Sequence, residues 1–259
     1  MSNYIEYNID SQGICILKIN RPPVNALSFD LLYDLKIIIK VLSKNAKILC
    51  LILCTDNNHF SAGADLKERK IMSMKEAKAA LDNFNDCYGI IESFPKPVIC
   101  AINGYCLGGG AELALCCDIR IGSVDSIIGF PEVSIGIIPG AGGTQRLPRL
   151  IGLSNAKYWI LSAHKFTAKE AKDYGFLNFV TSNKELLNKA IKISQELISN
   201  APIAITSAKL SIDKGYGVEN IKSKLEIERK HYNTCLNSED RLEALDAFKT
   251  KRKPKWENK

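Results

Sequence analysis

Two glutamates lie beside glycine clusters in an otherwise apolar part of the chain. Glu112 follows the run Gly108–Gly110 by two residues, and Glu132 precedes a second cluster at 136–143. An unpaired carboxylate is costly among apolar residues, so two of them in one stretch point to a shared use. Paired carboxylates suit acid–base chemistry on a carbonyl compound, because one group accepts a proton and the other gives one. Each also has a structural explanation, Glu112 as a negative charge at a helix N-terminus and Glu132 as a solvated loop residue.

The first glycine run removes every side chain from the start of a predicted helix. Bare N–H groups at such a helix N-terminus stabilise a developing anion. A second donor is expected from the small residues 61–64, because an oxyanion hole usually needs two, and Asp65 is expected to cap the helix that follows. Close helix–strand packing also requires glycine, so the spacing leaves both interpretations open. Neither cluster matches the dinucleotide-binding or P-loop patterns, which disfavours a nicotinamide enzyme or an ATPase.

These residues must be positioned by an alternation of strands and helices. The apolar runs at 14–19, 48–54 and 98–102 predict strands, and Ser28 predicts the start of the helix between the first two. Residues 66–94 read as helical, and after about residue 183 only helices are predicted, at 184–199, 202–214 and 218–236. This order predicts an α/β fold with parallel pairing, divided into a core at 1–195 and a helical region at 196–259.

Composition narrows the class of protein. The chain has 259 residues, of which 46% are hydrophobic and 24% charged, as in ordinary globular proteins. Its nine cysteines lie largely in apolar runs without zinc-ligand spacing, which predicts free thiols, no metal site and a reducing, cytoplasmic location. The N-terminus resembles no signal peptide, and no apolar run is long enough to span a membrane. The net charge of +7 permits anionic partners without choosing among them.

Three segments resemble, in order and spacing, the signature blocks of the enoyl-CoA hydratase/isomerase (crotonase) superfamily. They are FSAGADLKE, KPVICAINGYCLGGGAELALCCDIRI and GFPEVSIGIIPGAGGTQRLPRLIG. INRPPVNALS and the basic KRKPKW tail extend the resemblance over essentially the whole chain, although RPPVNAL is one residue shorter than its counterpart in many hydratases. The resemblance implies a crotonase-like ββα spiral core and a C-terminal helical region used for trimerisation, in a homotrimer or a homohexamer.

The resemblance also implies roles for single residues. The backbone N–H groups of Ala64 and Gly109 would form the oxyanion hole for a thioester carbonyl. Glu112 would act chiefly as the base that activates a water molecule, and Glu132 would deliver a proton to the α-carbon. The expected reaction is reversible syn addition of water to a trans-2-enoyl-CoA, as in fatty acid β-oxidation. Coenzyme A would be part of the substrate, with no separate cofactor, and it would contact Ala62, Asp65, Leu66, Lys67 and Gly140.

Several alternatives stay open at this point. Another crotonase reaction, such as methylglutaconyl-CoA hydration or enoyl-CoA isomerisation, would use much of the same site, although Glu112 argues against pure isomerisation. RNA binding is disfavoured because the charge is modest and no aromatic RNA-recognition motif is present. The basic tail is expected to be a solvated end, or by resemblance to approach the CoA phosphates of a neighbouring subunit.

Overall fold

The computed structural model describes residues 4–259, and its larger sheet forms the centre of the fold. In spatial order the strands of this sheet are β1 (Ile5–Ile9), β2 (Ile14–Ile19), β3 (Cys50–Cys54), β4 (Val98–Ile102), β6 (Ile119–Ser123) and β9 (Phe179–Thr181). β1 pairs antiparallel with β2, and every other pair in the sheet is parallel. The predicted parallel core is thereby confirmed, while the edge strand β1 was not anticipated.

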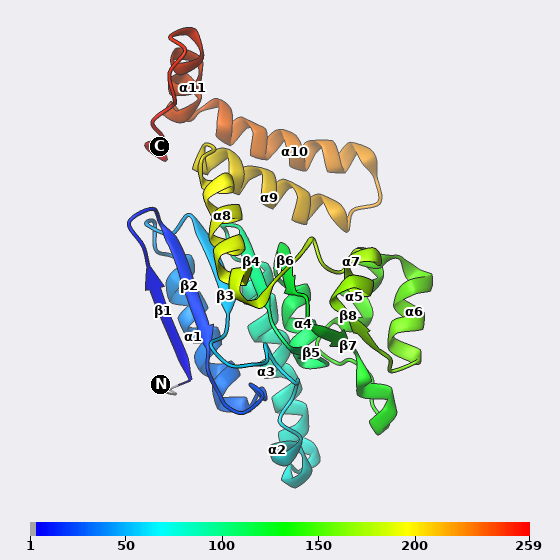
Figure 1. Cartoon of the computed structure of the whole chain (residues 1–259). Helices are drawn as coiled ribbons and strands as arrows, with labels where there is room; N and C mark the ends of the chain where they lie inside the picture. Colours follow the sequence, from blue (N-terminus) through cyan, green and yellow to red (C-terminus); the bar gives the residue numbers. More distant parts are fainter. Residues whose placement is uncertain (1–3) are drawn as a thin grey trace.

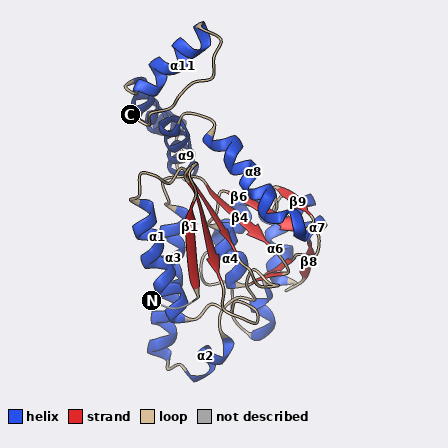
Figure 2. Cartoon of the chain, turned by 60° about the vertical axis from the view of Figure 1, so that its left-hand side comes forward, coloured by secondary structure: helices blue, strands red, loops and turns tan. Residues whose placement is uncertain are grey.

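Helices cover both faces of this sheet (Figure 2). α1 (Phe29–Ser43) and α3 (Met74–Glu92) pack together on one face, and α8 (Leu186–Ile198) lies on the other. β3 and β4 are therefore buried along their whole length, which is why their sequences are continuously apolar. As predicted, Ser28 caps α1, its hydroxyl accepting a hydrogen bond from Leu31 N at 3.3 Å.

A smaller sheet and a group of short helices lie beside the larger sheet (Figure 1). Its strands are β5 (Tyr105–Leu107), β7 (Ile127–Gly129) and β8 (Lys165–Thr167). The short helices are α4 (Gly109–Leu115), the 3-10 helix η1 (Pro131–Ile135), α5 (Gly143–Ile151), α6 (Leu153–Leu161) and α7 (Ala168–Asp173). Because α4 follows β5 directly and η1 follows β7, the pairing of β5 with β7 brings the starts of both helices together. The two glutamates singled out in the sequence lie in these two helices.

The stretch at 66–94 is helical, as expected, but it forms two helices. α2 (Leu66–Ile71) ends at Met72, which is extended, and α3 begins after Ser73. Ser73 and Glu76 form a reciprocal capping box, a signal that starts a new helix even within a helix-favouring composition. The helical prediction for this stretch is confirmed, whereas the break at 72–73 was not anticipated because the cap was overlooked.

The C-terminal helices extend beyond the sheet (Figure 1). After η2 (Asn183–Glu185) and α8 come α9 (Pro202–Tyr216), α10 (Ile221–Leu236) and α11 (Glu239–Lys249). α9 and α10 pack on each other, and the boundary expected at residue 195 falls inside α8. Within residues 4–259, no helix combines the length and apolar character needed to cross a bilayer.

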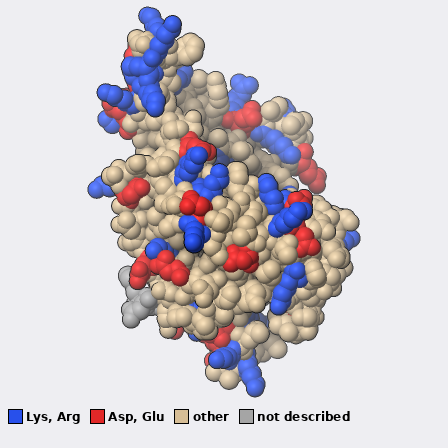
Figure 3. Space-filling view, in the orientation of Figure 1, with Lys and Arg blue, Asp and Glu red and all other residues tan. Residues whose placement is uncertain are grey.

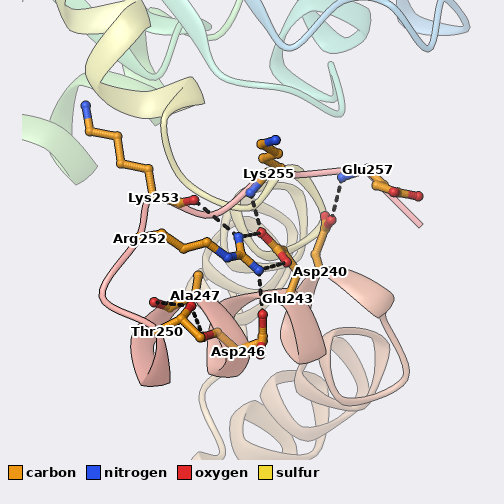
Figure 4. Close-up of polar contacts among 9 residues, drawn as sticks. All are labelled: Asp240, Glu243, Asp246, Ala247, Thr250, Arg252, Lys253, Lys255 and Glu257. Carbon is orange, nitrogen blue, oxygen red and sulfur yellow. Dashed lines mark hydrogen bonds and ion pairs between the residues drawn. The ribbon is translucent and has the colours of Figure 1, made fainter.

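The basic tail folds back on α11 rather than ending free in solvent. Lys and Arg side chains gather at this end of the molecule (Figure 3). Arg252 pairs with Glu243 at 2.5 Å and with Asp246 at 2.6 Å, and the backbone N–H of Glu257 donates to Asp240 at 2.8 Å (Figure 4). The expectation of a solvated end therefore holds for the lysine side chains but not for the backbone.

Candidate active site

A cavity of about 1290 Å³ opens where α2, α3, α4 and η1 meet. Both glutamates and both predicted oxyanion donors line it. The lining residues include Ala64, Gly109, Glu112 and Glu132 on the polar side, and Leu81, Phe84, Ile135, Ile137 and Ile138 on the apolar side. Groups that the sequence places far apart are thus brought to one cavity, as the resemblance implied.

Glu112 is fixed in the first turn of α4. Its side chain is only 3% exposed, and Oε1 accepts hydrogen bonds from the backbone N–H groups of Ala141 and Gly143, both at 2.8 Å. Burial raises the pKa of this carboxyl, and the two backbone donors offset part of the rise because they favour the ionised form. One oxygen is therefore held in place by the protein while the carboxyl remains able to exchange a proton.

The turn that supplies those donors is held by Arg146. Its guanidinium donates to Ala141 O at 2.9 Å and pairs with Glu92 at 2.7 Å. Gly142 has a φ of +100°, a conformation that side chains rarely adopt, and it lets the chain enter α5 with its first N–H groups directed at Glu112. The second glycine cluster thus positions the first glutamate.

Glu132 lies in η1, next to Pro131 at the start of that helix. It is 8% exposed, and among the described residues its Oε2 atom has no hydrogen-bond partner. Burial, with a further contribution from the charge of Glu112, raises the pKa of Glu132 to about 7. This carboxyl is therefore set up to hold a proton near neutral pH.

The predicted oxyanion donors also lie close to each other. No described residue accepts a hydrogen bond from Ala64 N or Gly109 N. A Cβ atom on Gly109 would lie 3.5 Å from Ala64 N, and one on Gly63 would lie 3.2 Å from Gly109 N. Ala64 and Gly109 line the same cavity as the glutamates, so these two free backbone N–H groups are candidate donors to a carbonyl oxygen.

Of the five residues expected to contact coenzyme A, only some line the cavity. Leu66 and Gly140 line the cavity, whereas Lys67 is exposed and lies outside its lining. Ala62 N donates to Val24 O at 2.9 Å. Asp65 caps α2 as predicted, accepting from Lys67 N at 3.0 Å, and it also pairs with Arg21 at 2.8 Å. Its carboxylate is thus already engaged in holding the loop and helix together.

Several residues of the site were not anticipated. Each glycine of the first run has its own neighbour: an added Cβ would meet Glu132 Oε1 at 2.9 Å from Gly108, Phe84 at 3.0 Å from Gly109 and Ser61 O at 2.6 Å from Gly110. Close packing is therefore sufficient reason for glycine at all three positions. Tyr88 also contacts the glycine run, because its hydroxyl donates a hydrogen bond to Gly109 O at 2.5 Å. The sequence holds one sign of the N–H groups that donate to Glu112, namely that the second glycine cluster lies close to the start of a helix.

Comparison with known proteins agrees with this geometry. The sequence profile of the enoyl-CoA hydratase/isomerase family matches residues 10–259. The short-chain-enoyl-CoA hydratase of Clostridium acetobutylicum is 39% identical over 248 residues, which cover 95% of each chain. The mitochondrial methylglutaconyl-CoA hydratase of Mus musculus is 39% identical over 253 residues, covering 95% of this chain and 80% of the relative.

A solved structure gives the same result at the level of the fold. The crystal structure of enoyl-CoA hydratase from Bacillus anthracis superposes with a TM-score of 0.96 at 39% identity, covering 99% of this chain and all of the other. The fold is therefore the crotonase fold with its C-terminal helices. The chain belongs to the enoyl-CoA hydratase/isomerase family, whose members act on CoA thioesters.

Proposed function

We propose that the protein is an enoyl-CoA hydratase that adds water reversibly to trans-2-enoyl-CoA, with syn stereochemistry. The observation that carries the proposal is the unequal pair of buried glutamates at one cavity. Glu112 has two backbone donors on one oxygen, whereas Glu132 has an oxygen without a partner and a pKa of about 7. The two donors to Glu112 favour its ionised form, which suits a base. The raised pKa of Glu132 keeps a proton on it near neutral pH, which suits an acid.

In the proposed hydration, one water molecule lies between the two carboxyls. Glu112 takes a proton from this water as its oxygen attacks the β-carbon of the substrate. The electron pair of the double bond moves toward the thioester, and the N–H groups of Ala64 and Gly109 stabilise the resulting enolate oxygen. Glu132 then protonates the α-carbon, giving a 3-hydroxyacyl-CoA. The pair carries one proton before and after the step, so a proton shift between the carboxyls resets the enzyme.

Coenzyme A enters this proposal as part of the substrate, without a separate cofactor. Leu66 and Gly140 line the cavity and support contacts with the thioester arm. Ala62, Asp65 and Lys67 lie within six residues of one another, in the loop before α2 and its first turn, and are proposed to contact coenzyme A. An enoyl-CoA isomerase would need only one carboxyl, so the fixed position of Glu112 favours hydration.

Assembly and location are parts of the same proposal. Large apolar side chains are exposed along the C-terminal helices, including Ile212, Tyr216, Leu225, Tyr232, Leu245 and Phe248. Exposed apolar surface of this kind marks protein–protein contacts, which supports a homotrimer or a homohexamer. All nine cysteines are free thiols, as suits a protein of the reducing cytoplasm, and a place in fatty acid β-oxidation follows from the proposed reaction.

The experiment that tests the function follows the loss of the conjugated thioester absorbance of crotonyl-CoA. Wild-type protein should hydrate this substrate rapidly, and Glu112→Gln and Glu132→Gln should each lower kcat by roughly 10²-fold or more, since each removes one proton-transfer group. Lys75→Met, an exposed substitution outside the cavity, is the control. A folded wild-type protein that binds CoA but does not hydrate crotonyl-CoA contradicts short-chain hydratase activity.

A further inference from the structure

Arg146 joins two helices and a turn behind the proposed active site. Its guanidinium donates through Nε and Nη2 to the two carboxylate oxygens of Glu92, at 2.9 and 2.7 Å, and through Nη1 to Ala141 O at 2.9 Å. Glu92 is the last residue of α3, whereas Ala141 lies in the turn before α5. Two-point contact with a carboxylate fixes the plane of a guanidinium as well as its distance. The turn is therefore held to the end of α3 through one planar group.

The helices that carry this ion pair do not explain it. The negative Glu92 lies at the C-terminal end of α3, and the positive Arg146 is the fourth residue of α5. Each charge is thus near the helix end at which the macrodipole disfavours it. The side chains of Arg146 and Glu92 are 18% and 48% exposed, and ion pairs that solvent reaches in this way add little to stability. The pair therefore points to a use beyond holding the two helices.

The turn that Arg146 holds is the one that binds the proposed base. Ala141 contacts Arg146 through its carbonyl oxygen and Glu112 through its N–H group. Gly143, two residues further on, supplies the second N–H group to the same oxygen of Glu112. Between them, Gly142 leaves room for the guanidinium, because a Cβ there would collide with Nη1. A continuous series of contacts thus runs from Glu92 through the turn to the carboxyl of the base.

The ion pair itself lies outside the cavity. Within residues 4–259, the lining of the proposed active site includes neither Arg146 nor Glu92. Glu92 lines a separate groove instead, together with Asp118 and Lys209. An effect of the pair on the reaction must therefore act through the position and the charge of Glu112.

We propose that Arg146 and Glu92 are positioning residues for the base, so that breaking their ion pair slows proton transfer by Glu112 without weakening the binding of the thioester. This inference rests on the proposed hydratase function and deepens it. Burial raises the pKa of the Glu112 carboxyl, and the N–H groups of the turn are the main contacts that oppose this rise. The positive charge of Arg146 opposes it as well. The pair therefore both aims the backbone donors and favours the ionised form that a base requires.

Steady-state kinetics with crotonyl-CoA test the proposal from both sides of the pair. Glu92→Gln keeps the shape of the side chain without its charge, and Arg146→Met removes the guanidinium. Each should lower kcat by roughly 10- to 100-fold, because a small displacement of the base slows proton transfer. KM should change by less than about threefold, since the cavity lining is intact. The double variant should be no slower than Arg146→Met, because both changes break the same pair.

A second ion pair of α3 supplies the matched control. Asp86 lies on α3 and pairs with Lys36 at 3.3 Å, with side chains that are 66% and 16% exposed. Asp86→Asn should leave kcat and KM unchanged.

The pH profile separates positioning from a general loss of structure. Without the charge of Arg146, the acid limb of kcat/KM, on which Glu112 becomes protonated, should move to higher pH. Arg146→Lys keeps the charge but not the planar three-point contact, so it should restore the limb and only part of kcat. Three further titratable or charged groups that act on or respond to Glu112 are unchanged in these variants, namely Glu132 of η1, Arg69 of α2 and Tyr88 of α3.

Two measurements without turnover separate this proposal from the hydratase proposal. Carbon-13 NMR of glutamate-labelled protein follows the Glu112 carboxyl, whose signal is the one lost in Glu112→Gln, and its titration should move to higher pH in Arg146→Met. Hydrogen exchange of the segment 136–147 should be faster in Glu92→Gln and in Arg146→Met, and unchanged in Asp86→Asn. If wild-type protein does not hydrate crotonyl-CoA, these changes still support the positioning role and refute only hydration.

Three results overturn the proposal. The first is a wild-type kcat in Glu92→Gln and Arg146→Met, and the second is an unchanged titration of Glu112 in Arg146→Met. The third is a raised KM with kcat unchanged, because that result assigns the pair to substrate binding. Thermal denaturation checks the fold of each variant, and if Arg146→Met does not fold, the kcat and the hydrogen exchange of Glu92→Gln decide.

Discussion

Gly108 and Glu132 are in direct contact across the start of α4. A Cβ atom on Gly108 would lie 2.9 Å from Glu132 Oε1 and 3.4 Å from the carboxyl carbon, and Gly108 has a φ of +51°. The residue that begins the helix of one proposed catalytic glutamate thus also forms the wall against which the other lies. The Glu132 carboxyl is thus confined by the turn that begins α4, whereas the Glu112 carboxyl is held by the N–H groups of Ala141 and Gly143.

Gly108→Ala is therefore expected to damage stability and activity together. The added methyl group is strained at a positive φ and displaces the Glu132 carboxyl, so we expect a loss of about 1–3 kcal/mol in the free energy of unfolding. We expect kcat/KM for crotonyl-CoA to fall by at least about tenfold, since a small displacement of an acid group slows proton transfer. Thermal denaturation and initial rates measure the two effects.

Gly89→Ala is the matched control for this substitution. Gly89 lies within α3 with open space where its Cβ would be, so alanine should stabilise the helix by about 0.5–1 kcal/mol. Rates should be unchanged. Full activity in Gly108→Ala would show that the contact between Gly108 and Glu132 does not position the acid.

Glu132 is expected to make the fold less stable as the pH rises. Its pKa is raised from 4.5 to about 7 in the folded state, so the folded protein binds more protons than the unfolded chain between these values. Stability therefore falls with pH across this window, by up to about 3 kcal/mol when the carboxyl is ionised. Glu132→Gln removes this titration. Urea denaturation at pH 5 and pH 8 should show the variant gaining stability relative to wild type, and a constant difference would refute the raised pKa.

The same ionisation is expected to control the rate. Productive enzyme holds one proton on the glutamate pair, so kcat/KM for hydration should fall as the pH rises through about 7 and Glu132 loses its proton. Dehydration of the 3-hydroxyacyl-CoA should show the same profile, because the overall reaction neither releases nor takes up protons. Rates in both directions from pH 5 to pH 9 test this, with butyryl-CoA binding as the control. Profiles without a fall near neutral pH count against Glu132 as the acid.

The buried parallel strands and two of the helix starts could be predicted from local sequence because local rules determine them. Ser28 and Asp65 each cap the helix expected after them, and the apolar runs at β3 and β4 form buried strands. The break between α2 and α3 could also have been found, since Ser73 and Glu76 form a standard capping box.

The site was only partly predictable because its geometry depends on contacts between distant segments. Glu112 meets the N–H groups of Ala141 and Gly143 across 29 and 31 residues, and no local rule gives that separation. The residue types were enough to identify the candidate acid and base. The contacts that surround each carboxyl could be seen only in the structure.

The folded C-terminal tail leads to a prediction about its own anchor. Arg252 and the backbone N–H of Lys255 both donate to Glu243, and these bonds lower the pKa of that carboxyl to about 2. Because the folded pKa lies below the ordinary value, the anchor is complete above about pH 5 and is lost as the pH falls toward 2. Glu243→Gln should release the tail at neutral pH, because an amide lacks the charge that holds Arg252.

Trp256 reports on this release. Its indole N–H donates to Ser199 O at 2.8 Å, whereas the other tryptophan, Trp159, is fully buried in the core. Glu243→Gln should shift the emission of Trp256 toward that of an exposed indole and speed tryptic cleavage at the basic tail, with the fold otherwise intact. Glu228→Gln, on the exposed surface of α10, should do neither. Unchanged emission and cleavage in Glu243→Gln would show that other contacts hold the tail, such as those of Asp240 with the backbone at Glu257.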